Sequence, residues 1–312
     1  SFNCDLFRVG EVMHGGFEMG NIWYNEPNYL DTAFDVMGDI ILSTAAQQYG
    51  GFTVPEVDKI LEPYAEKSYQ KYLSEYRNIS DDIYDKKEFT GMSLKNLDIK
   101  ACKYATEKVQ RDFEQGWQGI EMKLNSVGSS RGDYPFVTMT IGLATSTLGK
   151  MAAISLLKVH SEGQGKKGFK RPVLFPKIVF LYDKNLHGDG SDRYPSADVF
   201  NAGLDCSSKT MYPDWLSLTG DGYVAEMYKK YGRVVSPMGC RAFLSPWYER
   251  GGMHPADEND KPIFEGRCNL GVVSLHLPMI LAKSRKESKD FYEVLDYYLE
   301  LIRNHHKRTY DY

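Results

Sequence analysis

The sequence predicts a single α/β domain with parallel strands, forming either an open sheet or a closed barrel. Long stretches carry apolar residues at the three- and four-residue steps of amphipathic helices, and short β-branched runs bounded by turn residues indicate strands. The two patterns alternate along a chain with no internal repeat and no linker-like segment. With 312 residues the chain is long enough to bury one large core.

The first half of the chain is predicted to be mainly helical after a short strand at residues 3–9. Three helices are expected, at 31–48, from Pro55 to about 76, and from 94 to about 125. Gly116 and Gly119 leave open whether the third helix is continuous or broken. The polar residues 78–92 are expected to form a loop.

The second half of the chain is predicted to mix strands and helices. Strands are expected at 135–142, 173–182 and 271–277, and helices at 147–161, 197–208 and 278–310. Pro176 should interrupt the second of these strands, because proline cannot donate a ladder hydrogen bond. Residues 163–171, rich in glycine and lysine, are expected to form a loop.

The composition argues against several classes of function. The formal net charge is −4, so no global basic field favours nucleic-acid binding. No apolar run reaches the length of a membrane span, and the N-terminal residues lack the pattern of a signal peptide. The five cysteines include no C-x-x-C pair, so we expect neither a metal site nor a secreted disulfide framework. A reducing cytoplasm is the expected location.

Residues 236–241, Ser-Pro-Met-Gly-Cys-Arg, are the first candidate for chemistry. Pro237 lacks a backbone N–H and Gly239 lacks a side chain, so Cys240 is expected on an irregular turn. A thiol on a loop is more available for reaction than one in a strand. From these residues alone, a packing role for Cys240 is the commoner of the two explanations, because free cysteines are often buried.

Cys4 and Asn269 also fall at expected strand edges or turns, and strand ends of a barrel can meet at one site. No acid–base partner is evident near Cys4 or Cys240, so an ordinary cysteine hydrolase is not indicated. Thiols without a polar base suit hydrogen-atom chemistry, because a thiyl radical requires no deprotonation. The other candidates have simpler explanations: His276 is expected in the core of a strand, and Cys206 as a packed residue.

Seven short motifs, in this order, resemble the catalytic core of the anaerobic (class III) ribonucleoside-triphosphate reductases, the glycyl-radical branch of ribonucleotide reductase. They are Phe2-Asn3-Cys4 with 16–20, Gln48-Tyr49-Gly50-Gly51, Pro135-Phe136-Val137-Thr138, 175–180, 208–214, Pro237-Met238-Gly239-Cys240-Arg241 and 269–275. Each motif alone is weakly specific. Their order along nearly the whole chain makes the resemblance strong.

The resemblance implies a ten-stranded α/β barrel of which this chain supplies the first half, with a central finger loop carrying the radical cysteine. Cys240 would be the thiyl radical that removes the ribose 3′-hydrogen. Cys4 would face it and donate hydrogen as the 2′-hydroxyl leaves as water. Asn269 would bind the ribose hydroxyls, and Met238 would line the pocket.

Cofactors and partners follow from the same resemblance. Ribonucleoside triphosphates would be reduced to 2′-deoxyribonucleoside triphosphates, with formate as the reductant. A glycyl radical is expected on a C-terminal segment outside this chain, generated by an iron–sulfur activase that uses S-adenosylmethionine. The helices at 31–48 and 95–124 would form a homodimer interface at which deoxynucleotide and ATP effectors act.

Some features depart from the family pattern. Ala242 stands where a serine is usual, which leaves a thioredoxin-like protein open as the reductant, and the loop at 246–265 is longer than common. Residues 1–312 would be a single catalytic-core region without the ATP cone or the glycyl-radical and zinc segment, and inactive when isolated. Two alternatives stay open. One is a glycyl-radical lyase or dehydratase, which lacks a thiol at the place of Cys4, and the other is a catalytically silent nucleotide-binding fragment.

Overall fold

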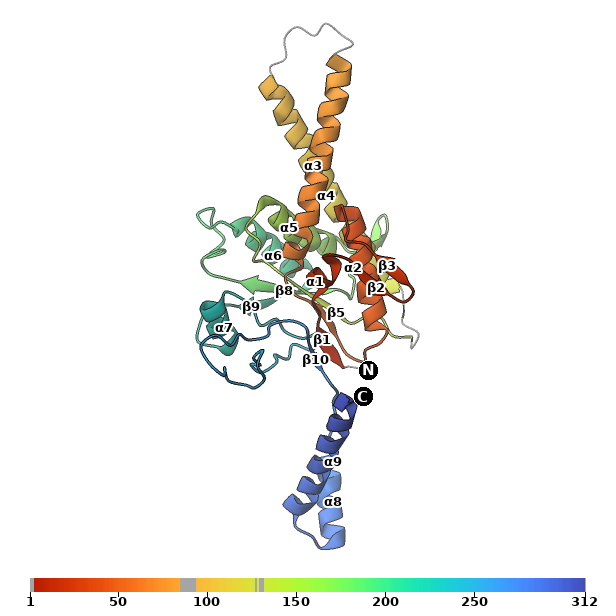
Figure 1. Ribbon diagram of the computed structural model, residues 1–312, viewed down its shortest axis with the longest axis vertical. Coiled ribbons are helices and arrows are strands. Elements are labelled where there is room, and N and C mark those ends of the chain that lie inside the picture. Colours follow the sequence, from red (N-terminus) through yellow and green to blue (C-terminus); the bar gives the residue numbers. More distant parts are fainter. Residues whose placement is uncertain (1–2, 85–93, 127, 129–131, 312) are drawn as a thin grey trace.

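A six-stranded mixed sheet lies at the centre of the protein (Figure 1). The computed structural model describes residues 3–84, 94–126, 128 and 132–311. Across the sheet the strands follow the order β10, β1, β4, β5, β8, β9. Their bounds in that order are Arg267–Asn269, Cys4–Leu6, Phe52–Val54, Val137–Ile141, Lys177–Tyr182 and Asp214–Ser217. Five strands run parallel and β10 pairs antiparallel with β1, which confirms the predicted α/β class.

Helices cover one face of this sheet. Strand side chains alternate, so Val137, Met139 and Ile141 of β5 point into the apolar core, while Thr138 and Thr140 point to the opposite face. We call this opposite face the inner face. The longer helices that share the core are α2 (Leu30–Ala45), α3 (Val57–Tyr84), α4 (Leu94–Ser126), α5 (Thr147–Glu162) and α6 (Ala197–Thr210).

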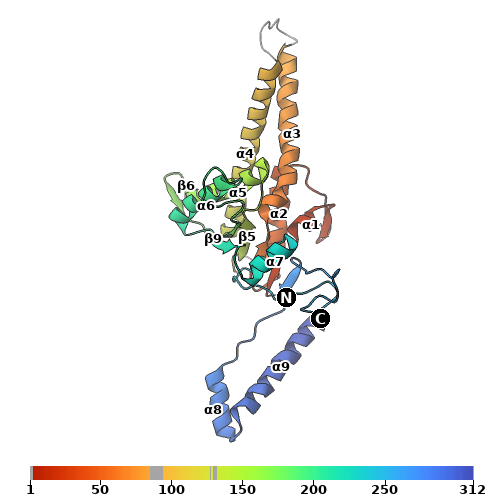
Figure 2. The same cartoon turned by 90° about the vertical axis from the view of Figure 1, so that its left-hand side faces the viewer.

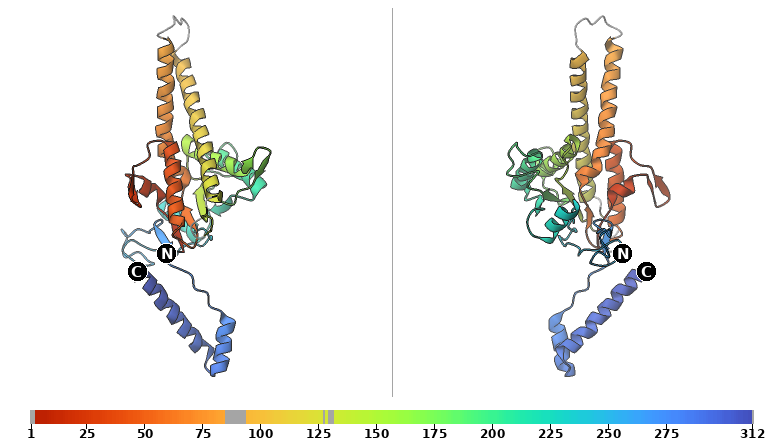
Figure 3. Two further views of the ribbon diagram at one scale, coloured as in Figure 1. Left: turned by 90° about the vertical axis from the view of Figure 1, so that its right-hand side faces the viewer. Right: turned by 60° about the vertical axis from the view of Figure 1, so that its left-hand side comes forward.

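Two helical hairpins project from opposite ends of the body (Figures 1 and 2). At one end α3 and α4 extend beyond the sheet. At the other end α8 (Leu277–Glu287) and α9 (Phe291–Asp311) are joined to β10 by an extended segment. Figure 3 shows the same arrangement from two further directions. In the part of the chain that the structure describes, no helix has the length and apolarity to cross a lipid bilayer.

Four smaller elements complete the described chain. Two are the short helices α1 (Val9–Met13) and α7 (Tyr223–Tyr231). The other two are antiparallel hairpins, β2 (Phe17–Met19) with β3 (Ile22–Tyr24) and β6 (Gln164–Lys166) with β7 (Phe169–Arg171).

The long helix predicted from residue 94 to about 125 is one continuous element, α4. The possible breaks at Gly116 and Gly119 do not occur. A Cβ at Gly116 would lie 2.1 Å from the ring of Phe34, so the glycine serves close packing of α2 against α4. The neighbouring Trp117 is fully buried and donates its Nε1–H to the Ala152 carbonyl at 3.0 Å.

Several predicted elements are wrong in extent. The expected loop at 163–171 contains the β6–β7 hairpin, whose turn uses Gly168 at φ 82°. Within the expected loop at 78–92, residues up to 84 continue α3, and 85–92 lie outside the described residues. The strand predicted at 173–182 begins only at Lys177, since Pro176 cannot donate a ladder hydrogen bond.

The strand predicted at 271–277 is also wrong, because the strand of this region is β10, at 267–269. His276 is therefore not a core histidine. It is exposed at the start of α8, where its Nδ1 accepts the Met279 N–H at 3.1 Å. The helix predicted at 278–310 is divided into α8 and α9, because Ser288 adopts a left-handed conformation at φ 54°.

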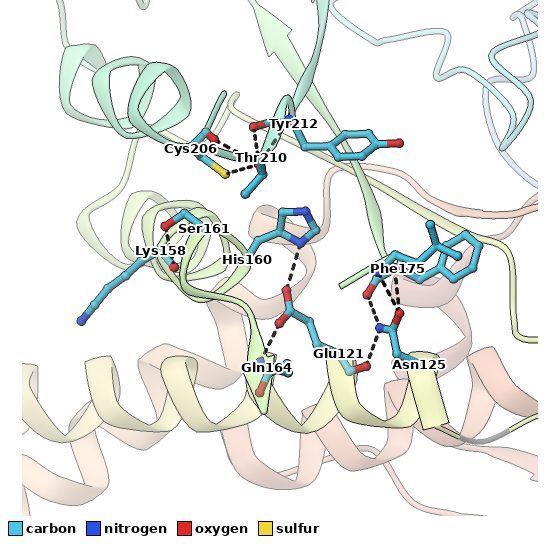
Figure 4. Close-up of polar contacts among 11 residues, drawn as sticks. Glu121, Asn125, Lys158, His160, Ser161, Gln164, Phe175, Cys206, Thr210 and Tyr212 are labelled. Atoms are coloured by element: carbon cyan, nitrogen blue, oxygen red, sulfur yellow. Dashed lines mark hydrogen bonds and ion pairs between the residues drawn. The ribbon is translucent and has the colours of Figure 1, made fainter. Parts of the chain in front are cut away.

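A buried polar cluster ties α4 to α5 and to the chain before β8 (Figure 4). His160 Nδ1 lies 3.0 Å from Glu121 Oε1, and Gln164 Nε2 donates to Glu121 Oε2 at 2.6 Å. The side chains of Glu121 and His160 are almost wholly buried. One turn along α4, the Asn125 side chain accepts the Phe175 N–H at 3.1 Å and donates to its carbonyl at 2.6 Å. The cluster therefore fixes the backbone that leads into β8.

Candidate active site

The loop at residues 232–242 lies along the inner face of the sheet. Val234 packs against Leu181 near the carboxyl end of β8. Further along the loop, Met238 is fully buried against Cys4 at the amino end of β1. The loop therefore runs from the carboxyl ends of the parallel strands to their amino ends.

The tip of this loop is a tight turn that carries Cys240. The Met238 N–H donates to the Ala242 carbonyl at 2.8 Å, and the Arg241 N–H donates to the Met238 carbonyl at 2.7 Å. Cys240 is exposed and belongs to no helix or strand. The irregular turn predicted for this cysteine is confirmed.

The Cys240 thiol lies close enough to Cys4 to affect the ionisation of the Cys4 thiol. Cys4 is buried, and its burial is the main cause that raises the pKa of its thiol. The hydrogen bond from Gly51 lowers this pKa, and the neighbouring Cys240 raises it further. Since the balance is a raised pKa, Cys4 keeps its S–H at neutral pH and is able to donate hydrogen.

Two glycines allow the chain before β4 to contact the Cys4 sulfur. The Gly51 N–H donates to Cys4 Sγ at 3.1 Å. A Cβ at Gly50 would lie 2.4 Å from the same sulfur and 2.3 Å from the Asn3 carbonyl oxygen. A Cβ at Gly51 would lie 2.8 Å from the Cα of Gly239 in the loop tip. The two glycines of the Tyr-Gly-Gly motif therefore allow the loop tip and β1 to approach each other closely.

Asn269 lies directly opposite Cys4, in the antiparallel pairing of β10 with β1. Its carbonyl accepts the Asn3 N–H at 2.8 Å, and its side-chain Oδ1 accepts the Gly271 N–H at 3.0 Å. Oδ1 is thus engaged locally. Among the described residues no acceptor is bonded to the Asn269 amide nitrogen, so its two N–H groups are available to a ligand hydroxyl.

A buried carboxyl lies beside Cys4 on the helix-facing side of β1. Asp5 pairs with Phe52 in the sheet and accepts a short hydrogen bond from Gln48 Nε2. Burial raises the pKa of Asp5 to about 7, against the lowering effect of the Gln48 bond. Asp5 Oδ1 and Gln48 Oε1 are both buried without a partner. A proton on Asp5 would remove the buried charge and turn one of its oxygens into a donor.

A cavity of about 380 Å³ adjoins the thiols at the amino ends of β4, β5 and β8. Gly50 and Phe136 belong both to its lining and to the surroundings of Cys4 and the loop tip. The rest of the lining is mostly aromatic and polar: Ala45, Gln48, Tyr49, Asp133, Tyr134, Pro135 and Phe175. A planar, partly polar ligand fits such a lining better than a purely apolar one.

The structure thus brings together all four residues singled out in the sequence: Cys4, Met238, Cys240 and Asn269. Sequence reasoning missed Asp5 and Gln48, although both flank motif residues. The hydrogen bond between them forms in a buried environment, and no local sequence pattern indicates that burial. Among the described residues, no group of three His, Cys, Asp or Glu side chains is placed to bind a metal ion. Two thiols and an amide suit hydrogen transfer to and from a hydroxyl-bearing carbon.

Comparisons with known proteins place the chain in one family. The profile of the family described as anaerobic ribonucleoside-triphosphate reductase matches residues 1–312. The reductase of that name from Haemophilus influenzae is 35% identical over 295 residues, covering 95% of this chain and 36% of that protein. The corresponding protein of enterobacteria phage T4 is 33% identical over 286 residues, covering 90% of this chain and 41% of that protein.

A crystal structure of the anaerobic ribonucleotide reductase from Thermotoga maritima, in complex with dATP and CTP, aligns with a TM-score of 0.49 at 12% identity. The alignment covers 96% of this chain and 43% of that one. The chain spans a little over a third of the length of the curated relatives it matches. Because the family profile covers every residue, the chain belongs to the anaerobic ribonucleoside-triphosphate reductase family.

Proposed function

We propose that this chain forms the thiol-bearing part of a reductase that converts ribonucleoside triphosphates to 2′-deoxyribonucleoside triphosphates by radical chemistry. The observation that carries the proposal is the approach of the Cys4 and Cys240 thiols, with Asn269 paired opposite Cys4. Family membership supports it. A glycyl-radical lyase or dehydratase is disfavoured, because such enzymes lack the first-strand thiol that faces Cys240 here.

Each of the three residues has a separate role in the proposed reaction. Cys240, as a thiyl, takes the hydrogen atom from ribose C3′, so an S–H bond forms and a C–H bond breaks. Cys4 gives a hydrogen atom to C2′ as the C2′–O bond breaks and the hydroxyl leaves with a proton as water, and the reductant then restores the Cys4 S–H bond. Cys240 then returns its hydrogen atom to C3′ and becomes a thiyl again. The free N–H groups of Asn269 would hold the ribose hydroxyls, while buried Met238 would keep water from the thiyl.

The net reduction requires two electrons, for which we propose formate as the source. Formate is oxidised to carbon dioxide while the ribonucleotide and one proton yield the deoxyribonucleotide and water, so atoms and electrons balance. Ala242 bears on this choice, because it places a methyl group and not a hydroxyl next to the Cys-Arg pair. A thioredoxin-like protein is the alternative source of the two electrons.

The thiyl would form when Cys240 gives its hydrogen atom to a glycyl radical on another segment of the complete protein. The exposure of Cys240 at a loop tip supports this, because a radical-bearing segment has access to the sulfur. An activase that contains an iron–sulfur cluster and uses S-adenosylmethionine would generate the glycyl radical. The five free cysteines fit action in a reducing cytoplasm.

We further propose that the sheet is half of a ten-stranded barrel and that residues 232–242 are its finger loop. The five parallel strands and the loop on their inner face support this arrangement. A homodimer would form along α2 and α4, with deoxynucleotide or ATP effectors nearby. A cavity of about 200 Å³ between these helices supports a binding role, since Asp31, Gln115 and Lys123 contribute polar groups to its lining.

The test is an anaerobic assay of the complete protein that contains this chain, with activase, S-adenosylmethionine and a ribonucleoside triphosphate. Deoxynucleotide should form with formate, or with a thioredoxin system if that is the reductant, and Cys4→Ser and Cys240→Ser should each abolish it. If neither reductant gives deoxynucleotide but labelled dATP or dTTP binds, the protein is a nucleotide-binding remnant. If Cys240 is essential and Cys4 dispensable, the chemistry is that of a lyase or dehydratase.

A further inference from the structure

Arg241, the residue after Cys240, joins the loop tip to two strands of the sheet. Its Nε donates to Asp214 Oδ2 at 2.6 Å, and its Nη2 lies 2.5 Å from the same oxygen. Its Nη1 donates to Thr138 Oγ1 at 3.2 Å and to the Gly239 carbonyl at 3.1 Å. Asp214 begins β9 and Thr138 lies in β5, so the guanidinium spans β8 between them.

The backbone of Arg241 adopts a left-handed conformation at φ 68°. A residue with a Cβ rarely takes this conformation and keeps it only where surrounding contacts hold it. Here the backbone N–H bonds to Met238 and the side chain bonds to Gly239, so both close the turn that presents Cys240. The guanidinium therefore holds a turn that the backbone alone does not favour.

The contacts of Arg241 fix the position of the turn but contribute little to the free energy of folding. The Arg241 side chain is 29% exposed and the Asp214 side chain 46%, and ion pairs this open to solvent add little to folding. The planar guanidinium reaches Asp214 and Thr138 at the same time, which a lysine ammonium cannot do. Loss of the guanidinium should therefore move the turn without unfolding the domain.

Other motif residues surround the loop tip. The Phe136 ring lies 3.1 Å from where a Cβ of Gly239 would be, and Lys177 Nζ lies 4.3 Å from the centre of that ring. Gly51 borders Gly239 from the side of β4. Sequence segments that supply no reacting group thus converge on the turn that holds Cys240.

We propose that Arg241 is a positioning residue, whose guanidinium, held by Asp214 and Thr138, aims the Cys240 sulfur at Cys4. The catalytic meaning of this role rests on the proposed function, because a thiyl must face both the ribose and the second thiol. The geometry itself is independent of any reaction. It is measured directly by how readily the two sulfur atoms are bridged.

The experiment uses dibromobimane, which bridges two thiols that lie a few ångströms apart. Alkylation of exposed Cys240 delivers the second bromomethyl group to Cys4, and mass spectrometry of tryptic peptides identifies the 4–240 bridge. The rate of bridge closure is compared with the rate of single alkylation at Cys240 and with the melting temperature. Cys4→Ser and Cys240→Ser give the background for the bridged peptide.

Arg241→Lys and Asp214→Asn should each slow bridge closure by tenfold or more. Single alkylation of Cys240 should change by less than twofold. Thr138→Val should slow closure severalfold, whereas Thr138→Ser, which keeps the hydroxyl acceptor, should restore it. Arg193→Lys is the matched control, since Arg193 forms an exposed pair with Asp189 away from the loop.

Closure rates within twofold of the unchanged protein in both Arg241→Lys and Thr138→Val would overturn the proposal. A fall in closure that Thr138→Ser shares with Thr138→Val would do the same, because the hydroxyl would then be irrelevant. Thr138→Val stays informative even if Arg241→Lys fails to fold, because valine has the shape of threonine. A protein that closes the bridge as expected but makes no deoxynucleotide would contradict the proposed function and leave this inference intact.

Discussion

The backbone N–H of Gly51 donates a 3.1 Å hydrogen bond to the sulfur of Cys4, so the chain before β4 holds one of two facing thiols. This contact requires the two segments to approach more closely than side chains allow. The same glycine borders Gly239 in the loop tip. The positions of the Cys4 and Cys240 thiols therefore both depend on a residue that carries no reacting group.

Gly50→Ala should destabilise the protein by about 1–3 kcal/mol, the typical range for overpacking. The added methyl would meet the Cys4 sulfur and the Asn3 carbonyl oxygen at 2.3–2.4 Å, and the carbonyl belongs to the backbone. Urea denaturation monitored by circular dichroism measures the loss, and the 4–240 bridging rate should fall with it. An unchanged urea midpoint would contradict the close contact.

Gly119→Ala is the matched control for that substitution. Gly119 lies within α4, and a Cβ there would meet no atom within 4 Å. Alanine should therefore stabilise the protein by up to about 1 kcal/mol, the difference in helix propensity between the two residues. Opposite signs for the two substitutions would separate local crowding at Cys4 from a general effect of replacing glycine.

Cys240 should react with iodoacetamide at least tenfold faster than Cys4 at pH 7.5. Cys240 is exposed, whereas Cys4 is buried and the pKa of its thiol is raised, so little thiolate is available there. Peptide mapping after timed quenching gives both rates. Exposed Cys102 and buried Cys206 serve as internal references for fast and slow alkylation. Equal rates at Cys4 and Cys240 would mean that Cys4 is not enclosed.

The sequence was sufficient for the long helices and for the apolar strands β5 and β8, because their periodicity extends over many residues. It was not sufficient for β4 and β9, whose three and four residues are too few to establish a periodicity. Phe52–Val54 became a strand because it fills the space between β1 and β5. Tertiary pairing thus overrode a segment that resembles the start of a helix, with Pro55 next to it.

The candidate site was predictable to the extent that it consists of motif residues. Cys4, Cys240 and Asn269 lie in motifs, and the structure places them together. The contacts of Arg241 with Thr138 and Asp214 join residues 103 and 27 positions apart, a pairing that no spacing rule contains. Asp5 shows the same limit, since its raised pKa depends on burial by segments remote in the chain.

Asp5→Asn should remove a pH dependence of stability. Because burial raises the pKa of Asp5 to about 7 in the folded protein, unfolding releases its proton between about pH 4 and 7. Stability from this group is therefore full below pH 4, falls as pH rises to about 7, and stays low above it. The loss is on the order of 2–4 kcal/mol. Asparagine stays neutral at every pH, so this pH dependence should disappear.

Urea midpoints at pH 5 and pH 8 test this expectation. The advantage of Asp5→Asn over the unchanged protein should be larger at pH 8 than at pH 5. Buried Asp58, whose pKa burial raises to about 6, is left in place and should give both proteins a common residual slope. A larger midpoint for the unchanged protein at pH 8 would show that burial does not raise the pKa of Asp5.

His160→Ala should destabilise the protein by about 3–5 kcal/mol, because it leaves Glu121 buried without its imidazole partner. Glu121→Gln should cost less, about 1–2 kcal/mol, since a neutral amide keeps hydrogen bonds to both His160 and Gln164. The double variant should lose less than the two single losses combined, because the residues contact each other. Exposed His254→Ala is the control and should change the urea midpoint little. Strictly additive losses would mean that the imidazole and the carboxylate do not interact, and that the chain before β8 is held by Asn125 alone.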